Sequence, residues 1–286
     1  MMFADLLMNN SQGSYAQSTV LPLVKNDLEW VFTNWSSNGC DLWEEVRSSD
    51  FFWNRAGYVY ALNMCEQLFN KAGDSSFASR CSSAKSAVQA TLSGHWTGSF
   101  VTESDNRQKD TSVIHAFSSF DVFSLTDDKV AKTIKTLAMT FCSEYAINQQ
   151  DTKKGEPGVL MGRYPGDSYA GGNPWQLLTA VLAKTFYQGA SSALNQGFEE
   201  LEDQHSWHDL LKIDRSASRL EFAQAAVKAG DAVMWRLYKY VKNDGGHIAE
   251  QISRSSGAQT SAKDLTWSYA NILSAIKERG KSLELI

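Results

Sequence analysis

The spacing of apolar residues constrains the fold of this chain more than any other feature. Between residues 126 and 141 they recur at intervals of four, three and four positions, at Val130, Ile134, Leu137 and Phe141. This spacing gathers them on one face of an α-helix. Thr126, Asp127 and Asp128 stand just before it, where they can cap the first turn and complement its positive end. The segment is therefore predicted to be a helix.

The same spacing returns at Trp175, Leu178, Leu182 and Phe186, after a proline at position 174 that fits the first turn of a helix. Further helices are predicted near 16–36, 51–73, 76–94, 111–118, 206–212, 217–242 and 263–279. Strand signals are weak, because the alternation of apolar and polar residues never lasts more than a few positions. The chain is therefore predicted to be all-α.

Length and composition favour one domain. With 286 residues, 43% of them hydrophobic, the chain can bury one large core, and no stretch is long enough to serve as a flexible linker. The formal net charge is -5 and the 27 basic residues are spread along the sequence, which argues against a nucleic-acid partner. No apolar run approaches the roughly 20 residues that cross a bilayer, so no membrane partner is expected.

The sequence contains no motif for a metal or another cofactor. The cysteines, Cys40, Cys65, Cys81 and Cys142, form no CxxC pair, which disfavours zinc and leaves the disulfide pairing open. His205 and His208 lie three positions apart, but no HExxH pattern or nearby acidic pair completes a metal site. Nucleotide-binding glycine loops are missing as well. We therefore predict no cofactor.

Three segments could carry chemistry, and the first is Asp-Leu-Trp-Glu-Glu-Val at 41–46. Its adjacent carboxylates, Glu44 and Glu45, follow Trp43. This combination suits a sugar site, because an aromatic face stacks on a pyranose ring while carboxylates take hydroxyl hydrogens or exchange protons. The alternative is a solvated loop anchored by a buried tryptophan.

The second segment runs from residue 161 to residue 175. Arg163 offers a planar donor fork and Asp167 an acceptor that could orient it. Tyr164, Tyr169 and Trp175 add apolar ring faces with polar rims. Taken alone, the segment fits a ligand-binding loop and a structural loop held by an Arg-Asp pair equally well.

The third segment, residues 247–270, contains Glu250 in a loop that precedes a predicted helix. The first turn of that helix presents Trp267, so a carboxylate and an indole could converge there. Taken alone, Glu250 cannot be distinguished from any other loop glutamate.

Together the three segments resemble the glucoamylase family of starch-degrading glycoside hydrolases. The motifs DLWEEV at 41–46, GRYPGDSYAGGNPW at 162–175 and AKDLTWSYA at 262–270 occur in the family's order, and LPLVKNDLEWV at 21–31 and HWTGSF at 95–100 are also similar. The resemblance implies that Glu44 is the general acid, Glu250 the general base and Glu45 a hydrogen-bonding partner of the substrate. The other residues that it places in or beside the substrate pocket are Trp43, Arg163, Tyr164, Asp167, Tyr169, Trp175 and Trp267.

The implied activity is the release of glucose from the non-reducing ends of α-1,4-glucans, namely starch, glycogen and maltodextrin. The family inverts the anomeric configuration, which requires two carboxyl groups about 6.5–9.5 Å apart so that water fits between one of them and the sugar. An oligosaccharide or polysaccharide is therefore the expected partner, and a monomer is the expected state.

The implied fold is an (α/α)6 barrel, the alpha toroid, with about twelve helices. This chain would begin near the fourth helix and hold about eight or nine of them, so residues 1–286 are expected to be a partial catalytic domain in which 1–15 match no motif. A chain lacking part of the barrel could instead be an inactive remnant that binds sugar weakly. A toroid glycosidase of another specificity, such as a trehalase-like enzyme, fits the motifs less well.

The localisation is left open by the sequence. Family members are secreted or vacuolar, but residues 1–8 carry no basic segment and Asp5 interrupts their apolar run, so they do not resemble a signal peptide.

Overall fold

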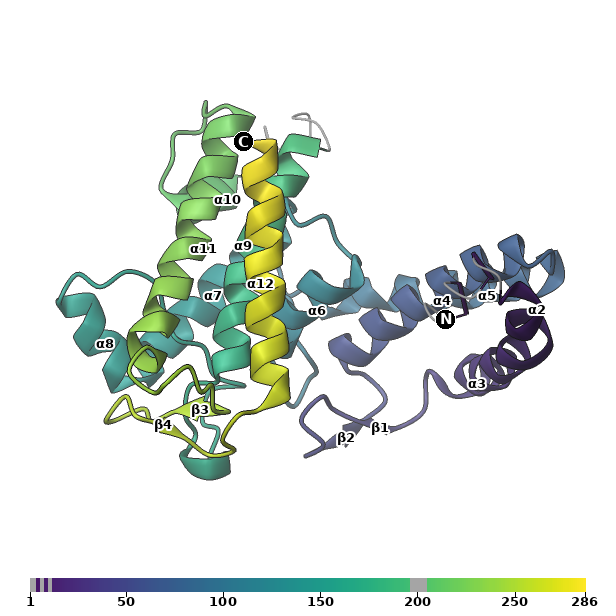
Figure 1. Ribbon diagram of the computed structural model, residues 1–286, viewed down its shortest axis with the longest axis horizontal. Coiled ribbons are helices and arrows are strands. Elements are labelled where there is room, and N and C mark those ends of the chain that lie inside the picture. Colours follow the sequence, from purple (N-terminus) through teal and green to yellow (C-terminus); the bar gives the residue numbers. More distant parts are fainter. Residues whose placement is uncertain (1–3, 6–7, 10–11, 196–204) are drawn as a thin grey trace. The chain divides into compact units, whose positions relative to one another are not determined.

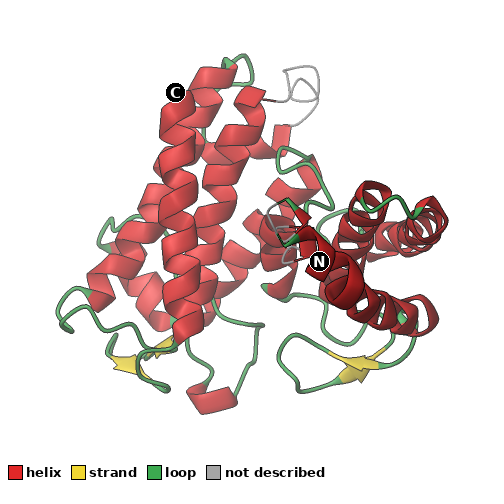
Figure 2. Ribbon diagram, turned by 45° about the vertical axis from the view of Figure 1, so that its right-hand side comes forward, coloured by secondary structure: helices red, strands yellow, loops and turns green. Residues whose placement is uncertain are grey.

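The computed structural model describes residues 4–5, 8–9, 12–195 and 205–286, and helices dominate these ranges (Figures 1 and 2). The chain divides into two compact units. Unit 1 comprises Met1–Trp96 and Glu103–Asn106, and unit 2 comprises Thr97–Thr102 and Arg107–Ile286. The expectation of one catalytic domain over residues 1–286 stays a prediction.

Unit 1 is built around a helical hairpin. Its elements are α2 (Gly13–Tyr15), a π-helical turn (Ala16–Val20), α3 (Leu21–Asn34), β1 (Gly39–Cys40), β2 (Arg47–Ser48), α4 (Phe52–Lys71), α5 (Ser75–Thr91) and a 3-10 turn (Leu92–His95). Asp74 starts α5 by accepting a hydrogen bond from the backbone N–H of Phe77 at 3.0 Å. A disulfide joins Cys65 of α4 to Cys81 of α5, with the Cα atoms 5.9 Å apart. The sequence had left this pairing open.

Glu103 closes the N-terminal end of α4. Its backbone oxygen accepts from the N–H of Phe52 at 2.8 Å, and its carboxylate oxygens accept from the N–H of Trp53 at 3.2 and 3.3 Å. The segment just before it belongs to unit 2, where the N–H of Val101 donates to Oγ1 of Thr133 at 2.9 Å. The chain therefore leaves unit 1, contributes to unit 2, and returns to cap a helix of unit 1.

Unit 2 surrounds one buried helix, α9. Its elements are α6 (Ser112–Phe120), α7 (Asp128–Glu144), α8 (Ala146–Lys153), a 3-10 turn (Tyr169–Gly171), α9 (Gln176–Asn195), α10 (His205–Leu211), α11 (Arg219–Val241), β3 (Gln251–Ile252), β4 (Gln259–Thr260) and α12 (Thr266–Leu285). Helices α6, α11 and α12 pack against α9, and Figure 1 shows α9, α11 and α12 side by side. The close approach of α11 requires Gly230, because a Cβ there would lie 2.5 Å from the ring of Tyr187.

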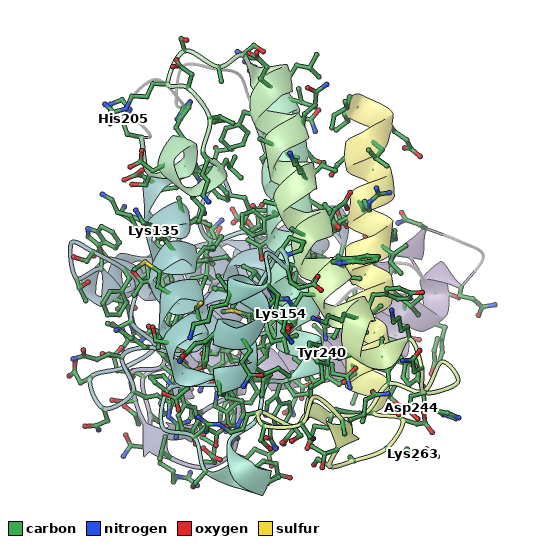
Figure 3. The ribbon with its side chains drawn as sticks, turned by 90° about the vertical axis from the view of Figure 1, so that its left-hand side faces the viewer. Lys135, Lys154, His205, Tyr240, Asp244 and Lys263 are labelled. Atoms are coloured by element: carbon green, nitrogen blue, oxygen red, sulfur yellow. A yellow bond between two sulfur atoms is a disulfide. The ribbon has the colours of Figure 1, made fainter. Side chains whose placement is uncertain are left out.

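The predicted all-α fold class is confirmed for the described residues. Two details differ from the expectation. Helix α8 was not predicted, and it is held by Asp151, which accepts from the hydroxyl of Tyr240 at 2.5 Å and from Nζ of Lys239 at 2.8 Å, both on α11. Tyr240 is labelled in Figure 3. Trp175, predicted in the first turn of a helix, lies just before α9, because it forms an antiparallel bridge with Gln251 instead.

Two further observations concern partners and metals. Among the described helices, none combines the length and apolar character needed to span a bilayer. In the same residues, no group of three or more histidine, cysteine or acidic side chains is placed to hold a metal ion. The prediction that residues 1–8 do not resemble a signal peptide concerns in part residues 1–3 and 6–7, which lie outside the described ranges.

Candidate active site

The loop from residue 160 to residue 175 in unit 2 is held by hydrogen bonds from Asn148 and Thr111 to its backbone. The side chain of Asn148 donates to the oxygen of Leu160 and accepts from its N–H, both at 2.9 Å. Thr111 holds the next part of the loop, donating through Oγ1 to the oxygen of Gly162 and through its N–H to the oxygen of Arg163 at 2.8 Å. The backbone at the start of the loop is therefore hydrogen-bonded to residues outside the loop.

Arg163 and Asp167 form a buried, bidentate ion pair in this loop. Nε of the arginine donates to Oδ2 of the aspartate at 2.8 Å, and Nη2 donates to Oδ1 at 2.7 Å. The guanidinium lies 5.2 Å from the ring centroid of Tyr164, 4.9 Å from that of Tyr169 and 5.3 Å from that of Trp175. A planar cation enclosed by aromatic faces is rigid, since both its donor fork and its faces are engaged. The structure thus brings together the residues predicted from this segment.

Gly172 allows the loop to fold back on Asp167. Its φ is +60°, and a Cβ at this position would lie 1.8 Å from the backbone oxygen of Asp167. Arg254 secures the turn, because Nη1 donates to the oxygen of Gly172 at 3.2 Å and Nη2 to the oxygen of Glu144 at 2.8 Å. Only glycine satisfies both the left-handed backbone and the close approach.

Glu250 is buried beside the N-terminus of α9. Its N–H donates to the oxygen of Ala262 at 2.8 Å, and its own oxygen accepts from the N–H of Gln176 at 3.2 Å. Its carboxylate accepts through Oε2 from Nε2 of Gln251 at 3.0 Å and from Oγ of Ser261. Among the described residues no donor is bonded to Oε1, so one oxygen of a positioned carboxylate remains to accept a proton.

Gln251 connects Glu250 to the loop of residues 160–175, called the aromatic loop because Tyr164, Tyr169 and Trp175 lie in it. Its side chain donates to Glu250 and accepts from Nδ2 of Asn173 at 3.0 Å, and its backbone pairs with Trp175. The two predicted segments are therefore parts of one hydrogen-bonded network. Neither Gln251 nor Ser261 was predicted, because neutral polar loop residues give no sequence signal of their own.

Trp267 lies in the first turn of α12, next to the same network. The following residue, Ser268, donates to the oxygen of Ala249 at 3.0 Å. The indole of Trp267 packs against the imidazole of His115, with ring centroids 6.1 Å apart. His115 is buried on α6, and Nδ1 is bonded to Oγ of Ser119 at 3.0 Å. Burial lowers the pKa of His115 to about 4, so the ring that supports Trp267 is uncharged near neutral pH.

Two residues in this area were not assigned from the sequence. The guanidinium of Arg107 lies 3.9 Å from the ring centroid of Tyr164, on a polar stretch without a motif. His115 lies in a predicted helix and was not singled out in the sequence. Each comes from a segment distant in sequence, so only the fold could reveal its neighbours.

Trp43, Glu44 and Glu45 lie in unit 1, in the turn between β1 and β2. Asp41 forms this turn, because its Oδ1 accepts from the N–H of Glu45 at 2.8 Å and of Val46 at 3.1 Å. Glu44 has a φ of +60°, a strained conformation for a residue with a side chain, and both glutamates are exposed. Glu250 and the aromatic loop belong to unit 2, and the pairing of Glu44 with Glu250 stays a prediction.

Comparison with known proteins assigns the chain to a family. A family-wide sequence profile described as "Glycosyl hydrolases family 15" matches residues 1–277. The chain belongs to this family. Among curated family 15 relatives, a glucoamylase of Blastobotrys adeninivorans is 31% identical over 284 residues, which cover 88% of this chain and 45% of the relative. Glucoamylase-1 of Schizophyllum commune is 30% identical over 318 residues, covering 98% and 52%.

Solved structures show the same relationship. The glucoamylase of Hormoconis resinae matches this family 15 chain with a TM-score of 0.84 at 25% identity, covering 98% of this chain and 51% of its own. That of Hypocrea jecorina matches with a TM-score of 0.83 at 29% identity, covering 98% and 50%. The fold is therefore that of an incomplete (α/α)6 barrel of this family, as predicted. The chain spans about half the length of the relatives that it matches.

Proposed function

We propose that this family 15 chain provides the acid and base of an exo-acting, inverting hydrolase that releases glucose from the non-reducing ends of α-1,4-glucans. Starch, glycogen and maltodextrin are the proposed substrates, and the chain is proposed to act as a monomer. The observation that supports this most is the carboxylate of Glu250, which is buried, oriented through Oε2 and joined to the aromatic loop around Arg163.

In the proposed reaction Glu250 acts as general base. Oε1 takes a proton from water while the water oxygen attacks the anomeric carbon of the terminal glucosyl unit. Glu44 donates its proton to the glycosidic oxygen as the bond to the anomeric carbon breaks. The products are glucose of inverted configuration and a glucan shortened by one unit. Both glutamates exchange their protons with solvent before the next cycle.

The other predicted site residues would bind the sugar. Arg163 and Asp167 are proposed to contact hydroxyl groups of the sugar, and Glu45 is proposed to accept another hydroxyl hydrogen. The ring faces of Trp43, Tyr164, Tyr169, Trp175 and Trp267 are proposed to pack on the apolar faces of the glucosyl units.

The test is glucose release from maltoheptaose by the wild type and by Glu44→Gln and Glu250→Gln. Each substitution keeps the size of the side chain and removes its acid–base function, so release should fall by about 10²- to 10⁴-fold. Glu284→Gln, an exposed glutamate on α12, is the matched control and should match the wild type. Equal rates in all four proteins would contradict the assignment.

A second function is favoured by one observation, namely that the chain spans about half the length of its relatives. In this alternative the chain is inactive and at most binds sugar weakly. A folded wild type, verified by circular dichroism, that releases no glucose above the level of the Glu250→Gln variant would support it. Release of glucose from trehalose but not from maltose would instead indicate a toroid glycosidase of another specificity.

A further inference from the structure

Arg236 of α11 is a charged side chain without exposed surface. It lies on the face that the helix buries, together with the apolar residues Val233 and Leu237. Burying a guanidinium is costly unless it is paired and hydrogen-bonded, so an apolar residue would be expected at this position. The arginine therefore needs a role that packing alone does not supply.

Three groups surround the buried guanidinium. Nη2 donates to the backbone oxygen of Glu156 at 2.6 Å, Nη1 donates to Oδ1 of Asn148 at 3.3 Å, and Nε lies 3.5 Å from Oδ2 of Asp151. Burial disfavours the charged form of Asp151, but hydrogen bonds from Lys239 and Tyr240 outweigh it and hold its pKa below the usual range. The aspartate is therefore ionised at neutral pH and supplies the counter-charge.

Asn148 connects the guanidinium to the aromatic loop. Its Oδ1 accepts from Arg236 and also from the N–H of Leu160 at 2.9 Å. Its Nδ2 donates to the oxygen of Leu160 at 2.9 Å and to that of Phe141 at 3.1 Å. A flipped carboxamide would present its NH₂ group to two donors, the guanidinium and the N–H of Leu160. Arg236 therefore helps to fix the orientation in which Asn148 holds the loop.

The start of the loop is joined to the proposed sugar-binding residues. Leu160 lies three positions before Arg163. Between them, the N–H of Met161 donates to Oγ1 of Thr179 at 3.0 Å, and its oxygen accepts from the N–H of Trp175 at 2.7 Å. The guanidinium of Arg163 lies 5.3 Å from the ring centroid of Trp175. A displacement of Leu160 would therefore be passed to both ends of the loop.

We propose that Arg236 is a positioning residue for the aromatic loop and acts through Asn148. It does not contact the sugar, but it fixes the carboxamide that holds Leu160 and thereby the place of Arg163 and Asp167. The proposal rests on the proposed function, in which the latter two residues bind the sugar. A purely structural role for Arg236, joining α8 to α11, has another consequence: fewer molecules fold, but each folded molecule binds substrate normally.

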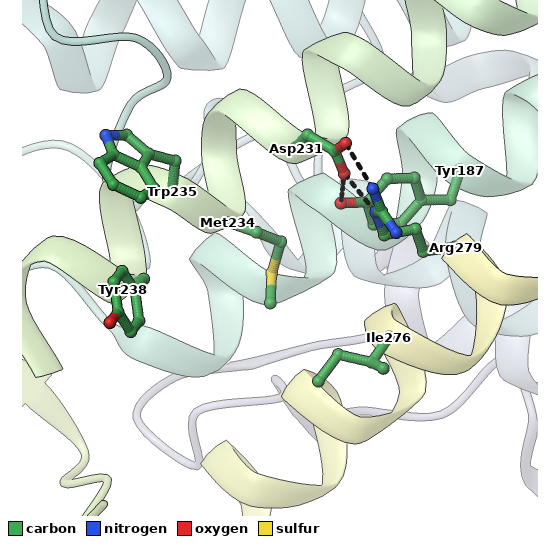
Figure 4. A pocket seen from close by; sticks show the side chains of 7 residues that line it. All are labelled: Tyr187, Asp231, Met234, Trp235, Tyr238, Ile276 and Arg279. Atoms are coloured by element: carbon green, nitrogen blue, oxygen red, sulfur yellow. Dashed lines mark hydrogen bonds and ion pairs between the residues drawn. The ribbon is translucent and has the colours of Figure 1, made fainter. Parts of the chain in front are cut away.

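Three variants of the full chain test the proposal. Arg236→Met keeps a long, unbranched side chain and removes every donor, whereas Arg236→Lys keeps the charge but lacks the fork that reaches Asn148 and Glu156 together. The control Arg279→Met removes a bidentate pair with Asp231, at 2.6 and 2.9 Å, that joins α11 to α12 instead of to the aromatic loop (Figure 4). Circular dichroism verifies folding, and Arg236→Lys carries the test if the methionine variant does not fold.

The first measurement, native-state hydrogen exchange followed by mass spectrometry, needs no substrate. The amides of Leu160 and Met161 should exchange at least about 10-fold faster in both Arg236 variants and at the wild-type rate in Arg279→Met. Amides in the middle of α9 should exchange as in the wild type. Unchanged exchange at Leu160 and Met161 would overturn the proposal, and so would an equal acceleration in α9, because loss of stability throughout unit 2 would then explain the effect.

The second measurement is glucose release from maltoheptaose. Arg163 and Asp167 exchange no protons in the proposed reaction, so both Arg236 variants should raise KM by about 10-fold and keep kcat within about 2-fold. A lower kcat at unchanged KM would show a purely structural role and overturn the proposal. No release by the wild type would contradict the proposed function instead, and hydrogen exchange alone would then decide the positioning role.

A double-mutant cycle tests the route through Asn148. Asn148→Ala alone should accelerate exchange at Met161. In that background Arg236→Met should add less than about 2-fold, because the carboxamide that it orients is gone. Effects that multiply would show that Arg236 acts by another route, which would overturn the proposal.

Discussion

Lowering the pH from 7 to 4 should destabilise unit 2 through a single histidine, His115. Only 7% of its surface is exposed, and burial together with the positive charge of Lys184 lowers its pKa to about 4. In the unfolded chain the same imidazole titrates near 6.5. Between these values the unfolded state binds a proton that the folded state does not, so the stabilising effect is complete above pH 6.5 and is lost as the pH falls toward 4.

The size of this effect follows from the two pKa values. They differ by about 2.5, and each pKa unit corresponds to about 1.4 kcal/mol, which gives about 3.5 kcal/mol in full. Roughly 3 kcal/mol of it is lost by pH 4, where half of the folded imidazole is protonated. A domain is typically stable by about 5–15 kcal/mol, so the loss would be a substantial part of the total. Carboxylates also titrate in this range and change the free energy of unfolding. A variant that differs only at His115 has the same carboxylates, so their effect cancels when the two proteins are compared.

The assay is urea unfolding at pH values from 4 to 7, followed by circular dichroism, for the wild type and His115→Gln. The free energy of unfolding of the variant should be lower at pH 7, because packing against Trp267 is lost, but it should fall by about 3 kcal/mol less than that of the wild type on acidification. His205→Gln, which removes an exposed histidine on α10, should retain the wild-type loss. Parallel curves for the wild type and His115→Gln would refute the reasoning.

Two further predictions concern unit 1 and the aromatic loop. Reducing the Cys65–Cys81 disulfide, which spans 16 residues, should lower the stability of unit 1 by about 3 kcal/mol, because the unfolded hairpin regains chain entropy. Thermal melts with and without reductant measure this loss, and a Cys65→Ala/Cys81→Ala variant that still responds to reductant would contradict it. Gly172→Ala should destabilise unit 2 by more than about 3 kcal/mol because of the contact with Asp167, whereas Gly166→Ala, at a φ of +77° with nothing within 4 Å, should cost about 1 kcal/mol. Equal losses in urea unfolding would show that the contact can relax.

The fold was predictable from the sequence wherever a helix carries its own signals. Helix α7 has regular apolar spacing, and Asp127 caps it by accepting from the N–H of Lys129 at 2.8 Å. Residues within the segment itself therefore suffice to predict this helix. Helix α8 has no such pattern. It is short and polar, and its stability depends on Asp151 reaching Lys239 and Tyr240 of α11, contacts that sequence spacing cannot reveal.

In the candidate site, too, contacts within one segment were predictable and contacts between distant segments were not. The ion pair between Arg163 and Asp167 was predictable, because the residues lie four positions apart in one loop. Arg107 and His115 come from other segments and meet the site only through the packing of unit 2. The pairing of Cys65 with Cys81 could not be predicted either, because it depends on how α4 and α5 align in the hairpin.

The path of the chain between Trp96 and Arg107 has a consequence for any attempt to obtain the two units as fragments. A break after Trp96 leaves Glu103 on the wrong fragment, so α4 loses the group that caps it. A break after Asn106 removes Val101 from its bond to Thr133. No single cleavage point between Trp96 and Arg107 keeps both the bond from Val101 to Thr133 and the cap of Glu103 on α4, so only a chain left uncut there retains both.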